Sequence, residues 1–129
     1  MNWFLEKAER DLDALRQEPN PDTIYNFFVT ARAAVDKGRE SIPKEAWNAL
    51  WLLPEIKACA RIANMGKHSI RGEMTGDGGE VGPSHADVAF HGGHMVYTIR
   101  FDDRDIEVVS LADRLLFEIR RVFEHYDVQ

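Results

Sequence analysis

The chain has 129 residues, of which 44% are hydrophobic and 29% charged, and it includes three Trp, three Tyr and seven Phe. This length and aromatic content fit one globular domain with its own core and exclude a disordered chain. The formal net charge of −6 disfavours nonspecific nucleic-acid binding, because Lys and Arg on phosphates supply most of that affinity.

Helical periodicity dominates the first half of the chain. Apolar residues at spacings of three and four predict a helix near residues 2–17. A second helix is expected to begin with Asn20 as its N-cap and Pro21 in its first turn, and to fade at Gly38. Residues 1–68 are therefore predicted to be the helical half of the domain.

Two further helices are expected before residue 68. The start signal of the first is Ser41 or Ile42 ahead of Pro43. Its apolar residues are Trp47, Leu50 and Trp51. Pro54 either opens the next helix or kinks this one, and Gly66 is the expected stop. The apolar stripe between them is Ile56, Cys59, Ala60 and Ala63.

The second half changes its hydrophobic period. Residues 69–84 form a Gly-rich connection, and residues 85–109 contain three short β-favouring runs, 87–90, 95–101 and 106–109. They predict a three-stranded antiparallel meander. Ser110 and Asp113 suggest a capping box that opens a final helix over 110–127. Its apolar stripe is Leu111, Leu115, Ile119, Val122 and Tyr126. The expected fold is α+β and mostly α, a bundle of about five helices with this meander before the last helix.

Targeting and compartment signals are also informative. Charges begin at Glu6, and no stretch approaches the roughly 18 apolar residues of a membrane-spanning helix, so we expect neither a signal peptide nor a membrane partner. Cys59 is the single cysteine, which excludes a disulfide within the chain and fits a cytoplasmic protein. Its place on an apolar stripe disfavours a catalytic thiol.

The segment from Arg61 to His68 is the strongest candidate site. At about 100° per residue, Arg61, Asn64 and His68 fall within about 60° of one another around a helix. Arginine binds phosphate and histidine moves protons near neutral pH, so a phosphodiester site is one interpretation. Lys67 and Arg71 extend the basic patch as substrate-binding candidates. The alternative is structural, because Asn64 and His68 also suit a helix C-terminus.

Two blocks within residues 20–70 carry a recognisable combination of residues. They are the segment 26–31 (Asn-Phe-Phe-Val-Thr-Ala) with Asp36, and Ala63-Asn64 with Lys67-His68. This combination resembles an uncharacterised family of small bacterial and phage proteins whose helical part is similar to HEPN domains. The resemblance implies a helical bundle that often dimerises. In active members it also implies an arginine and a histidine on one helix that cleave RNA without a metal.

The spacing and the neighbours of Arg61 bear on that resemblance. HEPN-like sites separate the arginine from the histidine by four to six residues, and six residues lie between Arg61 and His68. In active members a polar residue commonly follows the arginine, whereas Ile62 follows Arg61. If Asn64 instead matches that polar position, Ala63 occupies the arginine position and the site is inactive. Inactive members act as partners or scaffolds.

Histidines form a second cluster. His91 and His94 flank the expected Gly92-Gly93 turn, and His85 and Asp87 precede it. Imidazoles on a hairpin suit zinc or nickel, although turn-flanking histidines on exposed strands need no ligand. A metal-binding protein on His85, His91 and His94 is therefore the third interpretation of the chain.

The tryptophans allow a stacking role that core packing explains better. Aromatic faces stack on the bases of single-stranded nucleic acids. Trp47 and Trp51, however, stand at i, i+4 spacing beside Leu50, so we expect all three tryptophans, Trp3 included, to pack in the core.

Three classes of function follow from the sequence. The first is a HEPN-like binding or regulatory protein with RNA as a partner or substrate, and no cofactor is expected. If it cleaves RNA, His68 is the general base, Arg61 stabilises charge, and Asn64 with Lys67 positions the substrate. The second is a non-catalytic interaction protein in which Asn64, Lys67 and His68 bond to Asp36 or Asn26. The third is the metal-binding protein. A homodimer or another protein partner is compatible with the first two.

Overall fold

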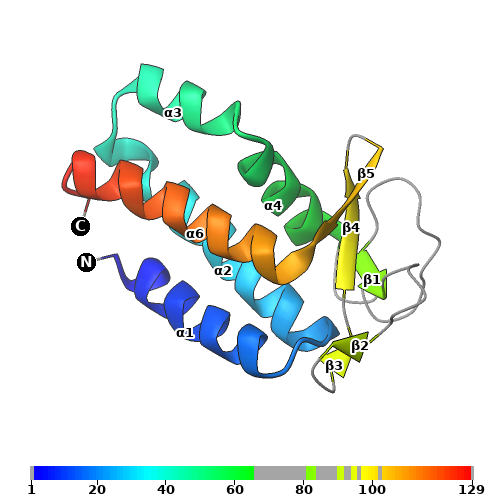
Figure 1. Cartoon of the computed structure of the whole chain (residues 1–129). Helices are drawn as coiled ribbons and strands as arrows, with labels where there is room; N and C mark the ends of the chain where they lie inside the picture. The colour runs from blue at the N-terminus through cyan, green and yellow to red at the C-terminus, as the bar shows by residue number, and fades with distance from the viewer. Residues whose placement is uncertain are drawn as a thin grey trace.

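The computed structural model is mostly helical, with a small antiparallel sheet at one end (Figure 1). It describes residues 2–65, 81–83, 90–91, 94–95, 97–101 and 103–128. The described helices are α1 (Trp3–Gln17), α2 (Pro21–Gly38), the 3-10 turn η1 (Arg39–Ser41), α3 (Lys44–Trp51), α4 (Pro54–Met65) and α6 (Val108–His125). The described strands are β1 (Val81–Pro83), β2 (Phe90–His91), β3 (His94–Met95), β4 (Tyr97–Phe101) and β5 (Arg104–Glu107). The predicted α+β character with mostly α structure is thus confirmed.

Side-chain caps at the N-termini explain where the first two helices begin. Asn2 Oδ1 accepts hydrogen bonds from the Phe4 and Leu5 amides at 2.8 and 3.2 Å, which starts α1. Asn20 and Thr23 form a reciprocal capping box, and Pro21 occupies the first turn of α2. Both predicted helices are confirmed, because capping and apolar periodicity agree in them.

The short helix α3 begins later than its expected start signal. Residues 39–41 form η1, and Pro43, which lacks a capping side chain, is the N-cap of α3. The prediction of Ser41 or Ile42 was therefore wrong, since the last turns of α2 tighten into 3-10 geometry. Pro54 opens α4. Gly66, the predicted stop, lies outside the described residues.

The apolar stripe of α4 is rotated from the predicted one. Ile56 and Cys59 are buried as expected, but Ala58 and Ile62 are buried with them. Ala60 and Ala63, which were predicted to be on the stripe, are only half-buried. The reason is that α4 packs against both α2 and α6, and the larger Ile62 fills the space between them.

The sheet differs from the predicted meander in its strand partners. β4 lies between β1 and β5 and is antiparallel to both, with Ile99 opposite Val81 on one side and Ile106 on the other. β1 comes from the segment that was expected to be a Gly-rich connection. The predicted antiparallel pairing of the second and third runs is present in β4 and β5, but β2 and β3 form a separate two-stranded ladder, so a single three-stranded meander is not confirmed. The turn between β4 and β5 contains Asp103 at φ 61°, a left-handed conformation that Asp tolerates.

Helix α6 starts earlier than the sequence suggested. The carboxylate of Glu107 caps it by accepting from the backbone amides of Val109 and Ser110, so Ser110 is not the N-cap. Val108 therefore begins the helix, although valine favours strands, because the cap and burial decide the conformation. At the other end the helix stops at His125, and Tyr126 is the C-cap and is partly exposed.

The core lies where α2 meets the other helices. α2 runs behind α6 and packs against α1, α4 and α6, while α6 also contacts β4 and β5 (Figure 1). Phe27 and Phe28 are fully buried on α2, with ring centroids 5.0 Å apart in an edge-on arrangement. The main neighbour of α3 is α4. No described helix combines the length and apolar content that crossing a membrane requires.

Candidate functional site

The sequence-predicted site lies on the outer face of α4 as far as the structure describes it. Arg61 and Asn64 are both exposed, and Ile62 between them is fully buried. The two polar residues therefore share a solvent-facing side of the helix, as their spacing predicted. Lys67, His68 and Arg71 lie outside the described residues, so a pairing of Arg61 with His68 stays a prediction.

The alternative structural role of this segment involves α2. Asp36 pairs with Arg32 one helical turn earlier, with Nε and Oδ2 3.5 Å apart, and Asn26 is exposed. Among the described residues, no hydrogen bond joins Asn64 to Asp36 or Asn26. The expected bonds from Lys67 and His68 fall on residues that the structure does not describe.

The histidine cluster is only partly described. His91 and His94 are register partners in the β2–β3 ladder, so their backbones lie side by side. His85 lies outside the described residues. Within the described part of the chain, no group of three or more His, Cys, Asp and Glu residues is placed to hold a metal ion.

Two of the three tryptophans pack against the core as predicted. Trp47 and Trp51 are half-buried, with ring centroids 5.8 Å apart, and the guanidinium of Arg32 lies 5.3 Å from the Trp51 ring centroid. Trp3 was predicted to be buried, but it is 57% exposed. It occupies the first turn of α1, where the core-facing position belongs to Leu5.

Cys59 has the environment of a structural residue. Its thiol is buried and donates to the carbonyl oxygen of Phe28 at a distance of 3.5 Å. Burial raises the pKa of the Cys59 thiol from its ordinary value of 9.0 to about 12, while Arg32 lowers it and Asp36 raises it. The thiolate is therefore scarce at neutral pH, which agrees with the expectation that this cysteine is not a nucleophile.

The described surface is hollowed along one side of α6, and we call this feature the α6 groove. It consists of three hollows of about 420, 380 and 390 Å³. The middle and last hollows share Glu55 and Arg114 as lining residues. The ion pair between Glu118 and Arg121 joins the first hollow to the middle one. The groove follows α6 from its C-terminal end to the β4–β5 hairpin.

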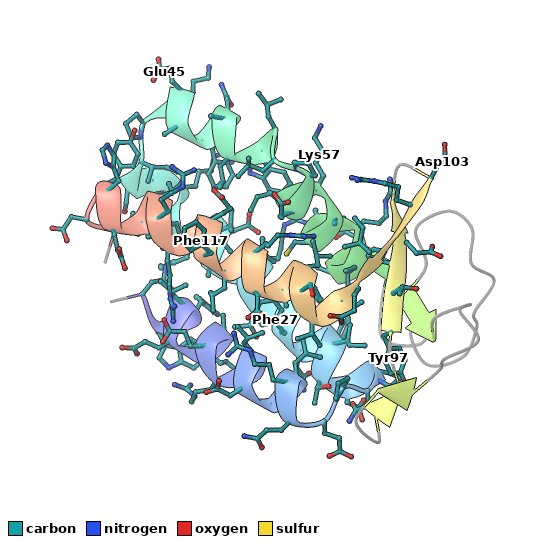
Figure 2. All side chains as sticks on the ribbon, viewed as in Figure 1. Phe27, Glu45, Lys57, Tyr97, Asp103 and Phe117 are labelled. Carbon is teal, nitrogen blue, oxygen red and sulfur yellow. The ribbon has the colours of Figure 1, made fainter. Side chains whose placement is uncertain are left out.

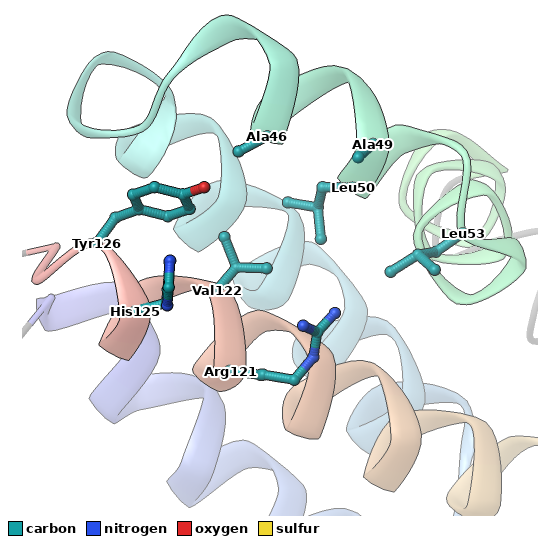
Figure 3. Close-up of a pocket in the computed structure, with 8 residues that line it drawn as sticks. All are labelled: Ala46, Ala49, Leu50, Leu53, Arg121, Val122, His125 and Tyr126. Carbon is teal, nitrogen blue, oxygen red and sulfur yellow. The ribbon is translucent and has the colours of Figure 1, made fainter.

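The hollow of about 420 Å³, the α3–α6 cavity, has one apolar wall and one polar wall (Figure 3). The apolar wall comes from α3 and the residues after it, Ala46, Ala49, Leu50 and Leu53. The wall from α6 and its C-cap consists of Arg121, Val122, His125 and Tyr126. In Figure 3 the phenol oxygen of Tyr126 points into the space between these walls.

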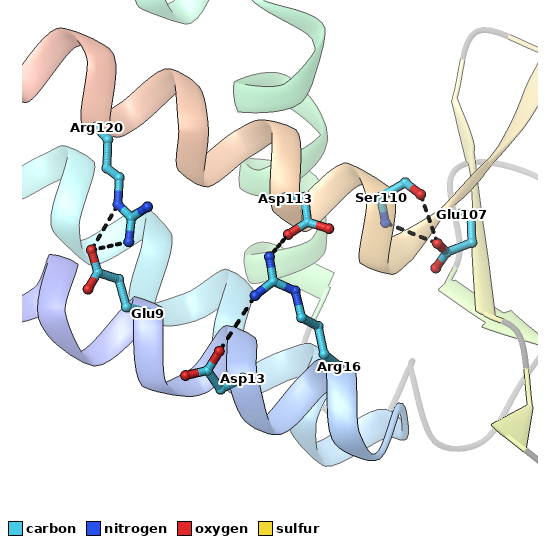
Figure 4. A network of polar contacts seen from close by, with 7 residues as sticks. All are labelled: Glu9, Asp13, Arg16, Glu107, Ser110, Asp113 and Arg120. Atoms are coloured by element: carbon cyan, nitrogen blue, oxygen red, sulfur yellow. Dashed lines mark hydrogen bonds and ion pairs between the residues drawn. The ribbon is translucent and has the colours of Figure 1, made fainter. Parts of the chain in front are cut away.

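Ion pairs hold the opposite side of α6 against α1 (Figure 4). Arg120 Nε donates to Glu9 Oε1 at 2.8 Å. Arg16 of α1 pairs with Asp113 of α6, and also with Asp13 at 3.5 Å. These arginines are therefore engaged by carboxylates of the chain itself. This side of α6 is thus joined to α1, and Asp113 also lines the middle hollow of the α6 groove.

Sequence reasoning missed the α3–α6 cavity. Arg121 and His125 stand at i, i+4 spacing on α6, the kind of arginine and histidine pair that drew attention to residues 61–68. That spacing was the available signal. It was overlooked because Val122 and Tyr126, the neighbours of this pair, were assigned to the apolar stripe of the final helix.

No protein-family model, curated protein sequence or solved structure matches this chain. Functional inference therefore rests on the chemistry of the described surface.

Proposed function

We propose that this protein is a non-catalytic binding protein that recognises a segment of a partner protein through the middle of the α6 groove. The observation that carries the proposal is the exposure of a large apolar side chain there. Phe117 on α6 is 64% exposed and lines the middle hollow (Figure 2). An exposed aromatic anchor beside a hollow is typical of protein interfaces.

The charges around Phe117 favour a protein partner over a nucleic acid. Arg114 Nε lies 3.9 Å from Oε2 of Glu55 on α4, and Arg121 makes an ion pair with Glu118. Each positive charge is thus accompanied by a carboxylate, whereas a phosphate backbone selects for an excess of Lys and Arg. A peptide segment with apolar anchors and charges of both signs suits this surface.

A charge placed on the proposed anchor provides the test. Tagged protein is expressed in its native cells as wild type, as Phe117→Asp and as Trp3→Asp, which alters another exposed aromatic residue, on α1. We expect wild type and Trp3→Asp to retain a shared partner and Phe117→Asp to lose it. Calorimetry with the purified partner should show binding to Phe117→Asp weakened at least about tenfold. Recovery of the same partner proteins with wild type and with both variants would contradict the proposal.

A second candidate function is the HEPN-like one, in which the protein binds RNA or cleaves it without a metal. It is favoured by the common exposure of Arg61 and Asn64 on α4. Here Arg61 and His68 carry catalysis, and Asn64, Lys67 and Arg71 hold the phosphates. The helical bundle and the homodimer that the resemblance implies belong to this candidate.

RNA cleavage in the presence of a chelator tests this second candidate. Purified wild type, Arg61→Ala and His68→Ala are incubated with labelled RNA, and Arg10→Ala, which removes an exposed arginine from α1, is the control. We expect cleavage or binding by wild type and Arg10→Ala and a loss in the other two variants. If none of the four proteins binds or cleaves RNA, RNA is removed as the ligand, and equal activity of all four would remove Arg61 and His68 as the site. Light scattering of the same samples measures whether the chain forms a dimer.

A further inference from the structure

The α3–α6 cavity is a separate part of the groove, and its shape follows from two features of α3. Helix α3 takes α4 as its main neighbour, so it passes α6 at a distance. The side chains that it directs toward α6 include Ala46 and Ala49, which are too small to close the gap (Figure 3). Leu50 is almost fully buried and forms the floor with Val122. The hollow is open to solvent on one side and has a volume of about 420 Å³, within the range of small-molecule sites.

The polar wall is assembled by the last turn of α6. Arg121 and His125 are one turn apart, and Tyr126 follows directly. The guanidinium of Arg121 is held by Glu118 Oε2, to which Nε and Nη2 donate at 3.2 and 2.8 Å. Both bonds use one edge of the guanidinium, so the Nη1 amino group at its other edge is left to meet a ligand. The rings of His125 and Tyr126 pack edge-on, with centroids 4.6 Å apart.

We propose that the α3–α6 cavity binds a small monocarboxylic acid with an apolar body. The guanidinium of Arg121 is a donor suited to a carboxylate, and Ala49, Leu50 and Leu53 on the facing wall suit a hydrocarbon chain. One guanidinium, already accompanied by Glu118, matches a single negative charge better than a phosphate dianion. This proposal concerns a different hollow from the partner-binding surface at Phe117 and does not depend on it.

Octanoate is the probe for this site, and octanamide and octanol are its uncharged analogues. Binding to the purified full chain is measured by calorimetry. We expect octanoate to bind wild type at least about tenfold more tightly than either analogue, because only the carboxylate gains charge-assisted hydrogen bonds.

Matched variants separate the two walls of the cavity. Arg121→Gln removes the charge, and its control Arg10→Gln removes an exposed arginine of α1 that lies outside the cavity. Ala49→Trp fills the space from the apolar wall, and its control Ala14→Trp enlarges an exposed alanine of α1. Octanoate binding should weaken at least about tenfold in Arg121→Gln and Ala49→Trp and stay within about twofold in the controls.

Three outcomes would overturn the proposal. They are a failure of octanoate to bind wild type, equal binding of octanoate to Arg121→Gln, and equal binding of octanamide and octanoate. Circular dichroism verifies that each variant is folded, and the substitutions were chosen at partly or fully exposed positions for that reason.

Discussion

The two sides of α6 have different surroundings. Toward α1 and α2, its side chains are buried or joined to α1 by Arg120–Glu9 and Arg16–Asp113. Toward α3 and α4, the same helix borders three hollows and exposes Phe117. Amphipathicity alone divides a helix into a buried face and a wet face. Here the open face also carries an aromatic anchor and a built cavity, which is why we assign binding to it.

The largest effect is expected from the buried side. Leu115 is fully buried on α6, so Leu115→Ala should lower the free energy of unfolding by about 2–5 kcal/mol through lost burial and a cavity. Urea denaturation followed by circular dichroism measures this change. A loss in the free energy of unfolding below about 1 kcal/mol would mean that the core relaxes around the smaller side chain. The buried side of α6 would then be loosely packed around Leu115.

The pH dependence of the free energy of unfolding tests whether Cys59 is buried between α2 and α4. Because burial raises the pKa of its thiol to about 12, the unfolded chain releases this proton near pH 9 while the folded chain keeps it. The unfolded state then binds fewer protons, so stability falls as pH rises from about 9 to 12, by at most about 1.4 kcal/mol per pH unit. Between about pH 8 and pH 10, wild type should lose about 1.4 kcal/mol more than Cys59→Ala. Parallel losses in the two proteins would show that the thiol titrates normally.

Substitutions at the N-cap of α6 are expected to lower the free energy of unfolding by an intermediate amount. Glu107 caps the helix by accepting from the amides of Val109 and Ser110, so Glu107→Ala should cost about 0.5–2 kcal/mol. Ser110→Ala removes the residue that sequence reasoning chose as the cap, and it should cost less, since the Ser110 hydroxyl only donates to Glu107 at 3.0 Å. If urea denaturation shows a larger loss of stability for Ser110→Ala than for Glu107→Ala, Ser110 is the N-cap, as the sequence predicted.

Local sequence patterns specify where some helices begin. The start of α2 was predictable because Asn20 and Pro21 signal it locally, and α1 was predictable from its apolar spacing. The burial of Ile62 could not be predicted in this way, because it depends on α4 packing against both α2 and α6. Likewise β1 was missed because its pairing with β4 is a long-range contact that residues 81–83 alone do not signal.

The candidate site was harder to predict than the fold. Spacing alone placed Arg61, Asn64 and His68 on one helical face, of which Arg61 and Asn64 are exposed on α4 and His68 lies outside the described residues. The cavity beside Arg121 and His125 depends on the distance between α3 and α6, which follows from how α3 and α4 pack. A periodic pattern within one helix contains no information about that distance.

The smallest effect on stability is expected at Phe117, and it sharpens the contrast with Leu115 two residues earlier. Phe117 is 64% exposed, so its truncation in Phe117→Ala removes little buried surface and should change the free energy of unfolding by no more than about 0.5 kcal/mol. The same urea experiment that measures Leu115→Ala measures this variant. A loss comparable to that of Leu115→Ala would place Phe117 in the core in solution and remove the anchor from the proposed interface. A stable Phe117→Ala protein that no longer binds its partner would instead separate folding from binding on adjacent faces of one helix.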